Sequence, residues 1–182
     1  IGGLSKFKKI DNPIKLSANE SALGPSPKAI EALERDKKNI FNYPESDSNH
    51  LREIISKKFN IDSARIICGA GSDQIFDLTC KLFLEPGDEV IVTEFGFIMH
   101  RIYAELHGAK VLFAKEKKYQ ASVDEILKKV TDKTKIVFIA NPNNPTGTYL
   151  SKDMMLNLRE KLRSNILLVI DDAYFEFMNQ KD

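Results

Sequence analysis

From about residue 65 to its end, the sequence alternates between short apolar runs and longer amphipathic stretches. The short runs read as strands, and the stretches between them carry apolar residues at helical spacing. Strands joined by crossover helices lie parallel and are covered on both faces. The pattern therefore predicts a three-layer α/β fold with a parallel sheet in the middle layer. The expected strands are 65–68, 89–93, 110–114, 136–140 and 166–170, and the expected helices are 72–84, 97–107, 123–130 and 151–163.

The first part of the chain has a different character. Residues 1–26 show little periodicity and contain several glycines and prolines, which indicates an irregular arm. Ser26-Pro27 predicts the start of a helix that runs to about Lys37, because serine suits the cap and proline the first helical position. A second helix is expected over residues 48–59.

Composition limits the class of protein. The chain has 182 residues, 42% of them hydrophobic, and a formal net charge of +1. This is enough for a sizeable core, and it gives no single-sign field for a nucleic acid or a membrane surface. Cys68 and Cys80 match neither a zinc spacing nor a redox pair, so reduced thiols in a cytoplasmic protein are expected. We expect no metal site.

The ends of the sequence suggest a piece of a longer protein. The chain starts at Ile1 and stops at Asp182, shortly after the last expected strand. A buried parallel strand needs covered neighbours, so a domain boundary there is unexpected. We therefore expect an N-terminal and central fragment.

In an open parallel sheet, ligands bind beyond the carboxyl ends of the strands. Residues 69–73, Gly-Ala-Gly-Ser-Asp, follow the first expected strand and open a helix. Free backbone N–H groups and the helix dipole make such a place an anion site, to which Ser72 adds a hydroxyl. A plain tight turn with Ser72 or Asp73 as the helix cap explains the same residues.

Asp171 follows an apolar run and is therefore expected at the end of a buried strand. A carboxylate in that position needs a partner. A protonated ring nitrogen about 4 Å away would supply roughly 4 kcal/mol at an effective dielectric near 20. Tyr174 presents a phenol to the same region. Helix capping or a salt bridge is the alternative role for Asp171.

Two further strand-end segments offer ligand contacts. Phe95 lies directly after the strand expected at 89–93, and Phe97 follows two residues later. Asn144 lies in residues 141–147, Asn-Pro-Asn-Asn-Pro-Thr-Gly, where the prolines restrict the backbone. Core packing for the aromatic rings and a surface loop for Asn144 remain the plain alternatives.

Residues 69–73, 141–147 and 171–177, in this order and at these separations, resemble the fold-type I pyridoxal-phosphate aminotransferases. Residues 15–20, 24–27 and 43–45 are similar to those of the histidinol-phosphate aminotransferases within that family. The resemblance covers essentially the whole chain. It implies that residues 1–45 form the arm and part of a small domain, and that residues 46–182 form the first part of the cofactor-binding large domain.

The resemblance implies a role for each strand-end residue. The backbone of Ala70, Gly71, Ser72 and Asp73 would hold the phosphate of pyridoxal 5'-phosphate, Phe95 would stack on its ring, Asn144 and Tyr174 would bind its phenolic oxygen, and Asp171 would pair with its ring nitrogen. Tyr43 would reach the cofactor phosphate of the neighbouring subunit, which implies a homodimer. Asn19 would line the substrate side.

Two features depart from the family pattern. Many relatives carry tyrosine where this chain has Phe95. The family's Schiff-base lysine lies a few tens of residues after the aspartate motif, whereas only eight residues follow Tyr174, and Lys181 comes too early. No catalytic residue is therefore assigned, and the chain alone is expected not to transaminate.

The implied reaction is amino transfer between L-histidinol phosphate and 2-oxoglutarate, a step of histidine biosynthesis with small-molecule substrates. Three alternatives remain open: an aromatic amino-acid aminotransferase, a lyase of the threonine-phosphate decarboxylase type, and a non-catalytic aminotransferase-like effector domain.

Overall fold

A computed structural model of the chain describes residues 18–179. The chain divides into two compact units, residues 1–54 and residues 55–182, and each is considered by itself. Expectations for residues 1–17, including the first part of the arm, and for Lys181 lie outside the described residues.

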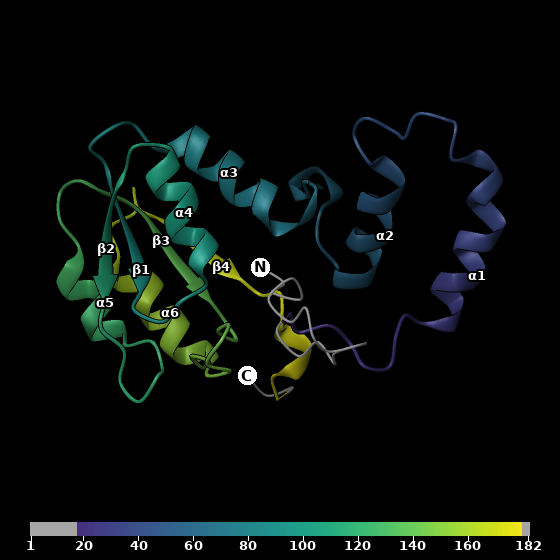
Figure 1. Ribbon diagram of the computed structural model, residues 1–182. Helices are drawn as coiled ribbons and strands as arrows, with labels where there is room; N and C mark the ends of the chain where they lie inside the picture. Colours follow the sequence, from purple (N-terminus) through teal and green to yellow (C-terminus); the bar gives the residue numbers. More distant parts are fainter. Residues whose placement is uncertain (1–17, 180–182) are drawn as a thin grey trace, which may run out of the picture. The chain divides into compact units, whose positions relative to one another are not determined.

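The second unit is built around a sheet of four parallel strands in the order β2-β1-β3-β4. The strands are β1 (Glu89–Thr93), β2 (Lys110–Ala114), β3 (Thr134–Ala140) and β4 (Leu167–Asp171). Each of the four was expected from the sequence, two with the same bounds and two within two residues (Figure 1). Since all pairings are parallel, the carboxyl ends of the strands lie at one edge.

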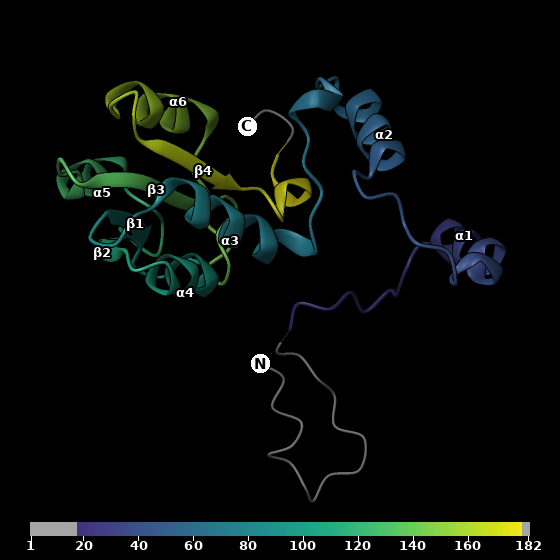
Figure 2. The ribbon, with the colours of Figure 1, turned by 90° about the horizontal axis from the view of Figure 1, so that it is seen from above.

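Helices cover both faces of this sheet. The helices are α3 (Gly71–Phe83), α4 (Ile98–Leu106), α5 (Val123–Lys129) and α6 (Lys152–Lys161). α3 packs with α4, and α5 packs with α6. Figure 2 shows α4 and α6 on opposite sides of the sheet. The three-layer parallel-sheet fold expected from the sequence is confirmed.

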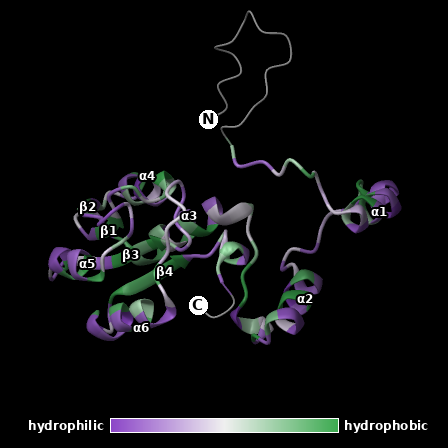
Figure 3. Cartoon of the chain, turned by 90° about the horizontal axis from the view of Figure 1, so that it is seen from below, coloured by the Kyte–Doolittle hydropathy of each residue, from purple (hydrophilic) through white to green (hydrophobic). Residues whose placement is uncertain are grey.

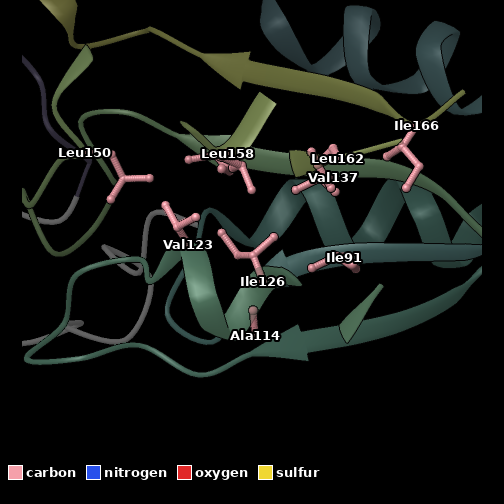
Figure 4. Packing of buried hydrophobic residues seen from close by; sticks show 10 residues of the cluster. Ile91, Ala114, Val123, Ile126, Val137, Leu150, Leu158, Leu162 and Ile166 are labelled. Atoms are coloured by element: carbon pink, nitrogen blue, oxygen red, sulfur yellow. The ribbon is translucent and has the colours of Figure 1, made fainter. Parts of the chain in front are cut away.

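Alternation along the strands divides the core in two. All of β1 is buried; Ile91 faces α5 and α6, whereas Val90 and Val92 face α3 and α4. Side chains point to opposite faces at successive strand positions, so one strand serves both clusters. Figure 4 shows the first cluster, in which Ile126 and Leu158 pack over the strands. Each such side chain contributes about 1.5–3 kcal/mol on burial.

The strand expected at residues 65–68 is not formed. The 3-10 helix η3 (Ser63–Arg65) occupies its start, and the chain then runs extended through Ile66 without entering the sheet. Ile67 is 77% exposed. An apolar run becomes a strand only when a neighbour supplies hydrogen-bond partners, and none of the described strands lies beside this one.

The first unit consists of helices without a buried core. α1 (Pro27–Asp36), η2 (Lys37–Asn39) and α2 (Asn49–Phe59) contain no buried residue, and α2 crosses the boundary between the units. Pro27 occupies the first position of α1 as expected, but the Ser26 side chain makes no cap hydrogen bond. The domain boundary expected at residue 45 stays a prediction.

Hydropathy follows the layers of the second unit. Figure 3 shows hydrophobic colouring along β3 and β4 and mixed colouring on α5 and α6.

The described chain ends shortly after the 3-10 helix η4 (Phe175–Phe177). None of the helices described has the length and apolar character needed to span a membrane.

Candidate functional site

The winding of the sheet changes direction between β1 and β3. From β1 the chain passes through α4 to β2, and it then returns through α5 to β3 on the other side of β1. In open α/β sheets such a switch point forms a crevice at the carboxyl ends of the strands. The loops after β1, β3 and β4 start there, so their side chains are the ones to consider.

The first turn of α3 is open to an anion. Gly71 has φ +73°, and its N–H donates to the Gly69 carbonyl at 2.9 Å. Ala70, at the cap position, offers no side-chain cap, and nothing lies within 4 Å of the Cβ position at Gly71. The Ala70 N–H is also occupied, because it donates to Gln74 Oε1 at 2.6 Å. The first N–H groups of a helix have no partner within it, so the N–H groups of Ser72 and Asp73 are the ones that can bind an anion. Neither Ser72 nor Asp73 is the cap residue; both lie inside the first turn.

Asp171 ends β4 beside a buried histidine. His100 Nε2 lies 3.2 Å from Asp171 Oδ2, and the two side chains are 2% and 8% exposed. Asp171 Oδ1 accepts from the Ala173 N–H at 3.2 Å. The carboxylate thus has one partner on each oxygen, which reduces the cost of its burial.

Aromatic rings fix the orientation of His100. The imidazole stacks on Phe138, with centroids 4.9 Å apart and planes 14° apart. Phe76 and Phe97 meet the imidazole edge-on at 4.7 Å and 5.6 Å. Sequence analysis missed His100. The available signal was a histidine on the apolar face of an expected helix, which by itself does not identify its partner.

The pKa of Asp172, the next residue along the chain, is affected by the Asp171 carboxylate at the end of β4. Partial burial and then the neighbouring Asp171 carboxylate raise the pKa of Asp172 above its ordinary value. A ligand with a positive charge at this point would be favoured by both carboxylates.

The loop after β3 is held by two asparagines other than the expected one. The Asn141 side chain accepts from the Leu150 N–H at 2.7 Å and donates to the Leu150 carbonyl at 3.1 Å. Asn143 Nδ2 donates to Thr146 Oγ1 at 2.8 Å. Asn144 is half-buried, and its amide makes no hydrogen bond with another described residue. The loop therefore leaves the Asn144 amide available for a ligand.

The two phenylalanines after β1 have different surroundings. Phe95 is 44% exposed, and its ring packs against Tyr119 with centroids 5.4 Å apart. The Phe97 ring lies against Phe76 and His100. Phe97 is thus the ring linked through His100 to Asp171, whereas Phe95 packs on the loop after β2. Phe95 as the stacking residue stays a prediction.

The remaining candidates are less constrained. Tyr174 is half-buried, and its ring is tilted against Phe177 at 6.3 Å. Tyr43 and Asn19 are exposed residues of the first unit, and Asn19 has φ +52°. Their placement toward a site in the second unit stays a prediction.

Solved structures share this architecture. A histidinol-phosphate aminotransferase from Sinorhizobium meliloti, in complex with pyridoxal-5'-phosphate, superposes with a TM-score of 0.86 at 24% identity, over 90% of this chain and 45% of that one. The Clostridium acetobutylicum histidinol-phosphate aminotransferase gives 0.78 at 25% identity, over 88% and 47%. The chain accordingly has the fold of the fold-type I, pyridoxal-phosphate-dependent aminotransferases.

Sequence comparison places the chain more closely. The profile of the aminotransferase class I and II family matches residues 11–182, and the chain belongs to that family. It is 59% identical to the histidinol-phosphate aminotransferase of Pelagibacter ubique (strain HTCC1062) over 99% of its own length, and 47% identical to that of Paramagnetospirillum magneticum (strain ATCC 700264 / AMB-1) over its full length. In both cases the chain spans about 50% of the relative.

Proposed function

We propose that the second unit binds pyridoxal 5'-phosphate and that the protein transfers an amino group between L-histidinol phosphate and 2-oxoglutarate, a reaction of histidine biosynthesis in the cytoplasm. The observation that carries the proposal is the Asp171 carboxylate, buried at the end of β4 with His100 on one oxygen. The names of the relatives at 59% and 47% identity support the substrate.

The residues present suit the three polar parts of this cofactor. The uncapped first turn of α3 suits a phosphate, since its backbone N–H groups and the helix dipole favour an anion. The free amide of Asn144 suits a phenolic oxygen, with Tyr174 as the second partner. Asp171 suits a protonated ring nitrogen.

The cofactor, when bound, supplies an electron sink for the bond electrons released at the substrate carbon. The task of Asp171 is to keep the ring nitrogen protonated through its negative charge. His100 holds that carboxylate in place by binding its Oδ2. Asn144 and Tyr174 would bind the phenolic oxygen and so orient the cofactor, and Phe95 would cover a face of its ring.

Two roles depend on a second subunit or on the first unit. We propose that Tyr43 reaches the phosphate site of a partner subunit in a homodimer, and that Asn19 lines the substrate side. Tyr43 is fully exposed, and Phe41, two residues before it in the chain, is another exposed aromatic side chain. This exposure supports a contact outside its own unit.

The test is a transamination assay on the protein expressed from its complete reading frame. We expect amino transfer from L-histidinol phosphate to 2-oxoglutarate. Because a charge at about 4 Å contributes roughly 4 kcal/mol, Asp171→Ala should lower kcat/KM by between about a hundredfold and a thousandfold. Asp153→Ala, which removes an exposed aspartate of α6 that has no role in the proposed site, is the matched control and should stay within a few-fold. Equal effects of the two substitutions would contradict the role of Asp171.

The same assay separates the alternatives. Faster turnover of aromatic amino acids would favour an aromatic aminotransferase, and decarboxylation of threonine phosphate would favour a lyase. A protein that binds the cofactor without turning over any of these compounds would favour the effector domain.

A further inference from the structure

The loop after β2, residues 115–120, has a conformation that none of the proposed roles uses. Lys118 and Tyr119 have φ +53° and +63°, a backbone region that residues other than glycine seldom occupy. Lys117 and Gln120 exchange backbone hydrogen bonds of 2.9 and 3.1 Å across this turn. The Tyr119 carbonyl accepts from Thr148 Oγ1 at 2.6 Å. Such strain persists only where the surroundings enforce it, and it gathers at functional sites.

This loop contacts the segment after β1 at Phe95. Glu116 Oε1 accepts from the Phe95 N–H at 3.2 Å, and the Tyr119 ring packs on the Phe95 ring. From the opposite neighbour of β1, Asn143 Nδ2 donates to the Phe95 carbonyl at 3.1 Å. The main chain of Phe95 is therefore held from both flanking loops.

Stability alone does not account for these contacts. Glu116 Oε2 and Asn143 Oδ1 are buried oxygens with no hydrogen-bond donor in the part of the chain that the structure describes. A buried acceptor without a donor costs free energy, and a buried carboxylate costs more than an amide. A structural contact at this place would be cheaper without a charged group.

A short and tightly packed stretch of main chain joins Phe95 to His100. The turn from Thr93 to Gly96 is closed by a Gly96 N–H to Thr93 carbonyl bond of 3.1 Å, and a Cβ on Gly96 would lie 2.6 Å from Thr93 Oγ1. Phe97 is the cap residue of α4, and its carbonyl accepts from the His100 N–H at 3.2 Å. The turn has little freedom, so a shift of Phe95 moves the first turn of α4.

We propose that Glu116, assisted by Tyr119, is a positioning residue that sets Phe95, Phe97 and through them His100 against Asp171. The loop after the edge strand β2 thereby tunes a carboxylate on the other side of β1. The part of this inference that concerns pyridoxal phosphate rests on the proposed function; the part that concerns the protein contacts does not.

The experiment compares Glu116→Leu with Glu116→Gln, which keeps an oxygen acceptor. Glu94→Leu is the matched control, because Glu94 is an exposed carboxylate next to Phe95 in the chain. Amide exchange of Phe95, relative to the amide of Val92 within β1, and the ring nitrogen resonances of His100 are measured by NMR well below the unfolding temperature. Pyridoxal phosphate affinity is measured on the protein from its complete reading frame.

Losing a hydrogen bond to a charged group should speed Phe95 exchange relative to Val92 by about tenfold or more and shift the His100 signals in Glu116→Leu. Cofactor affinity should fall about tenfold, whereas Glu116→Gln stays within about threefold and Glu94→Leu matches the wild type. Tyr119→Ala should shift the His100 signals in the same direction, which keeps the test valid if Glu116→Leu does not fold.

A lower unfolding temperature with unchanged Phe95 exchange and unchanged His100 signals would overturn the proposal and leave Glu116 a stabilising residue only. Wild-type protein that fails to bind pyridoxal phosphate would instead overturn the proposed function. The NMR measurements would then still decide whether Glu116 positions His100.

Discussion

At the scale of single residues, the most informative contact joins His100 and Asp171, 71 positions apart in the chain. Both side chains are buried, so each would be costly without the other. The contact also connects α4, the helix between β1 and β2, with β4, the strand that pairs with β3. It therefore fixes the switch point of the sheet as well as one carboxylate.

Removal of the imidazole should reveal this coupling. His100→Phe preserves a ring that can stack on Phe138 but leaves Asp171 Oδ2 without its partner. We expect a loss of about 1–3 kcal/mol in the free energy of unfolding, measured with urea by circular dichroism. His50→Phe, on the exposed surface of α2, is the control and should change little. An effect of His100→Phe below that of the control would contradict the pairing.

The two cysteines should differ in reactivity. Burial, and then the nearby Asp77 charge, raise the pKa of Cys80 from its ordinary 9.0 to about 11. At pH 8 only about one Cys80 in a thousand is then a thiolate, which is the reactive form. We expect a thiol reagent to label Cys68 rapidly and Cys80 slowly in the folded chain. The Cys68→Ser variant should therefore show no rapid labelling.

The same shift makes stability depend on pH. The Cys80 thiol holds its proton to a higher pH in the folded chain than in the unfolded chain. Its contribution to the free energy of unfolding is therefore complete below pH 9. It is lost as pH rises from about 9 to about 11. Rapid labelling of Cys80 in the folded Cys68→Ser chain would show that the thiol is accessible.

Sequence predicted some of the site residues better than others. Asp171 could be expected at a strand end because an apolar run precedes it, and the structure places it there. The expectation that this strand is buried was wrong, because β4 is half-buried and Ile170 is 39% exposed. His100 could not be assigned, because its partner is distant in sequence and a histidine at helical spacing has many uses. Likewise, the sequence of residues 141–147 did not show that the Asn141 and Asn143 side chains hold the loop by hydrogen bonds whereas the Asn144 side chain does not.

At the scale of elements, helix starts depend on whether a cap side chain is engaged. Ser151 Oγ accepts from the Met154 N–H at 3.4 Å at the start of α6, whereas Ser122 before α5 makes no side-chain cap bond. We expect Ser151→Ala to cost about 1 kcal/mol in unfolding free energy and Ser122→Ala a few tenths at most. Equal losses would show that the cap bond at α6 contributes nothing.

Element boundaries were predictable where the signal is local. The alternation of buried strands and amphipathic helices is contained in a dozen residues, so β1 and β2 could be delimited from sequence. The apolar run at residues 65–68 carries the same local signal, but a strand needs a partner that sequence periodicity does not report. This is why the one wrong strand lies where the sheet has no place for it among the described residues.

At the scale of the whole second unit, β4 is an open edge. Within the described residues it pairs only with β3, and beside it lies a hollow of about 840 Å³ lined by apolar side chains that include Leu82, Leu167 and Ile170. An apolar edge strand with unpaired backbone groups is a template for association. The 182-residue chain should therefore self-associate as its concentration rises.

A charge on the edge should reduce this association. Ile170 is 39% exposed, and Ile170→Lys places an ammonium on β4. Ile98→Lys, the same substitution at an exposed position of α4, is the control. Light scattering over a range of concentrations should show less association for Ile170→Lys than for Ile98→Lys or the unaltered chain. Equal association of all three would place the contact elsewhere.

The strand order has a consequence for synthesis. Of the described strands β1 is made first, yet it lies inside the sheet, with β2 on one side and β3 on the other. At about 5–20 residues per second, several seconds pass between the completion of β1 and that of β3. By the end of that time α3, α4, β2 and α5 have been made, but the flank of β1 that β3 will occupy still has no strand partner. Among the described strands, the one made first thus depends on two strands made later for its backbone hydrogen bonds.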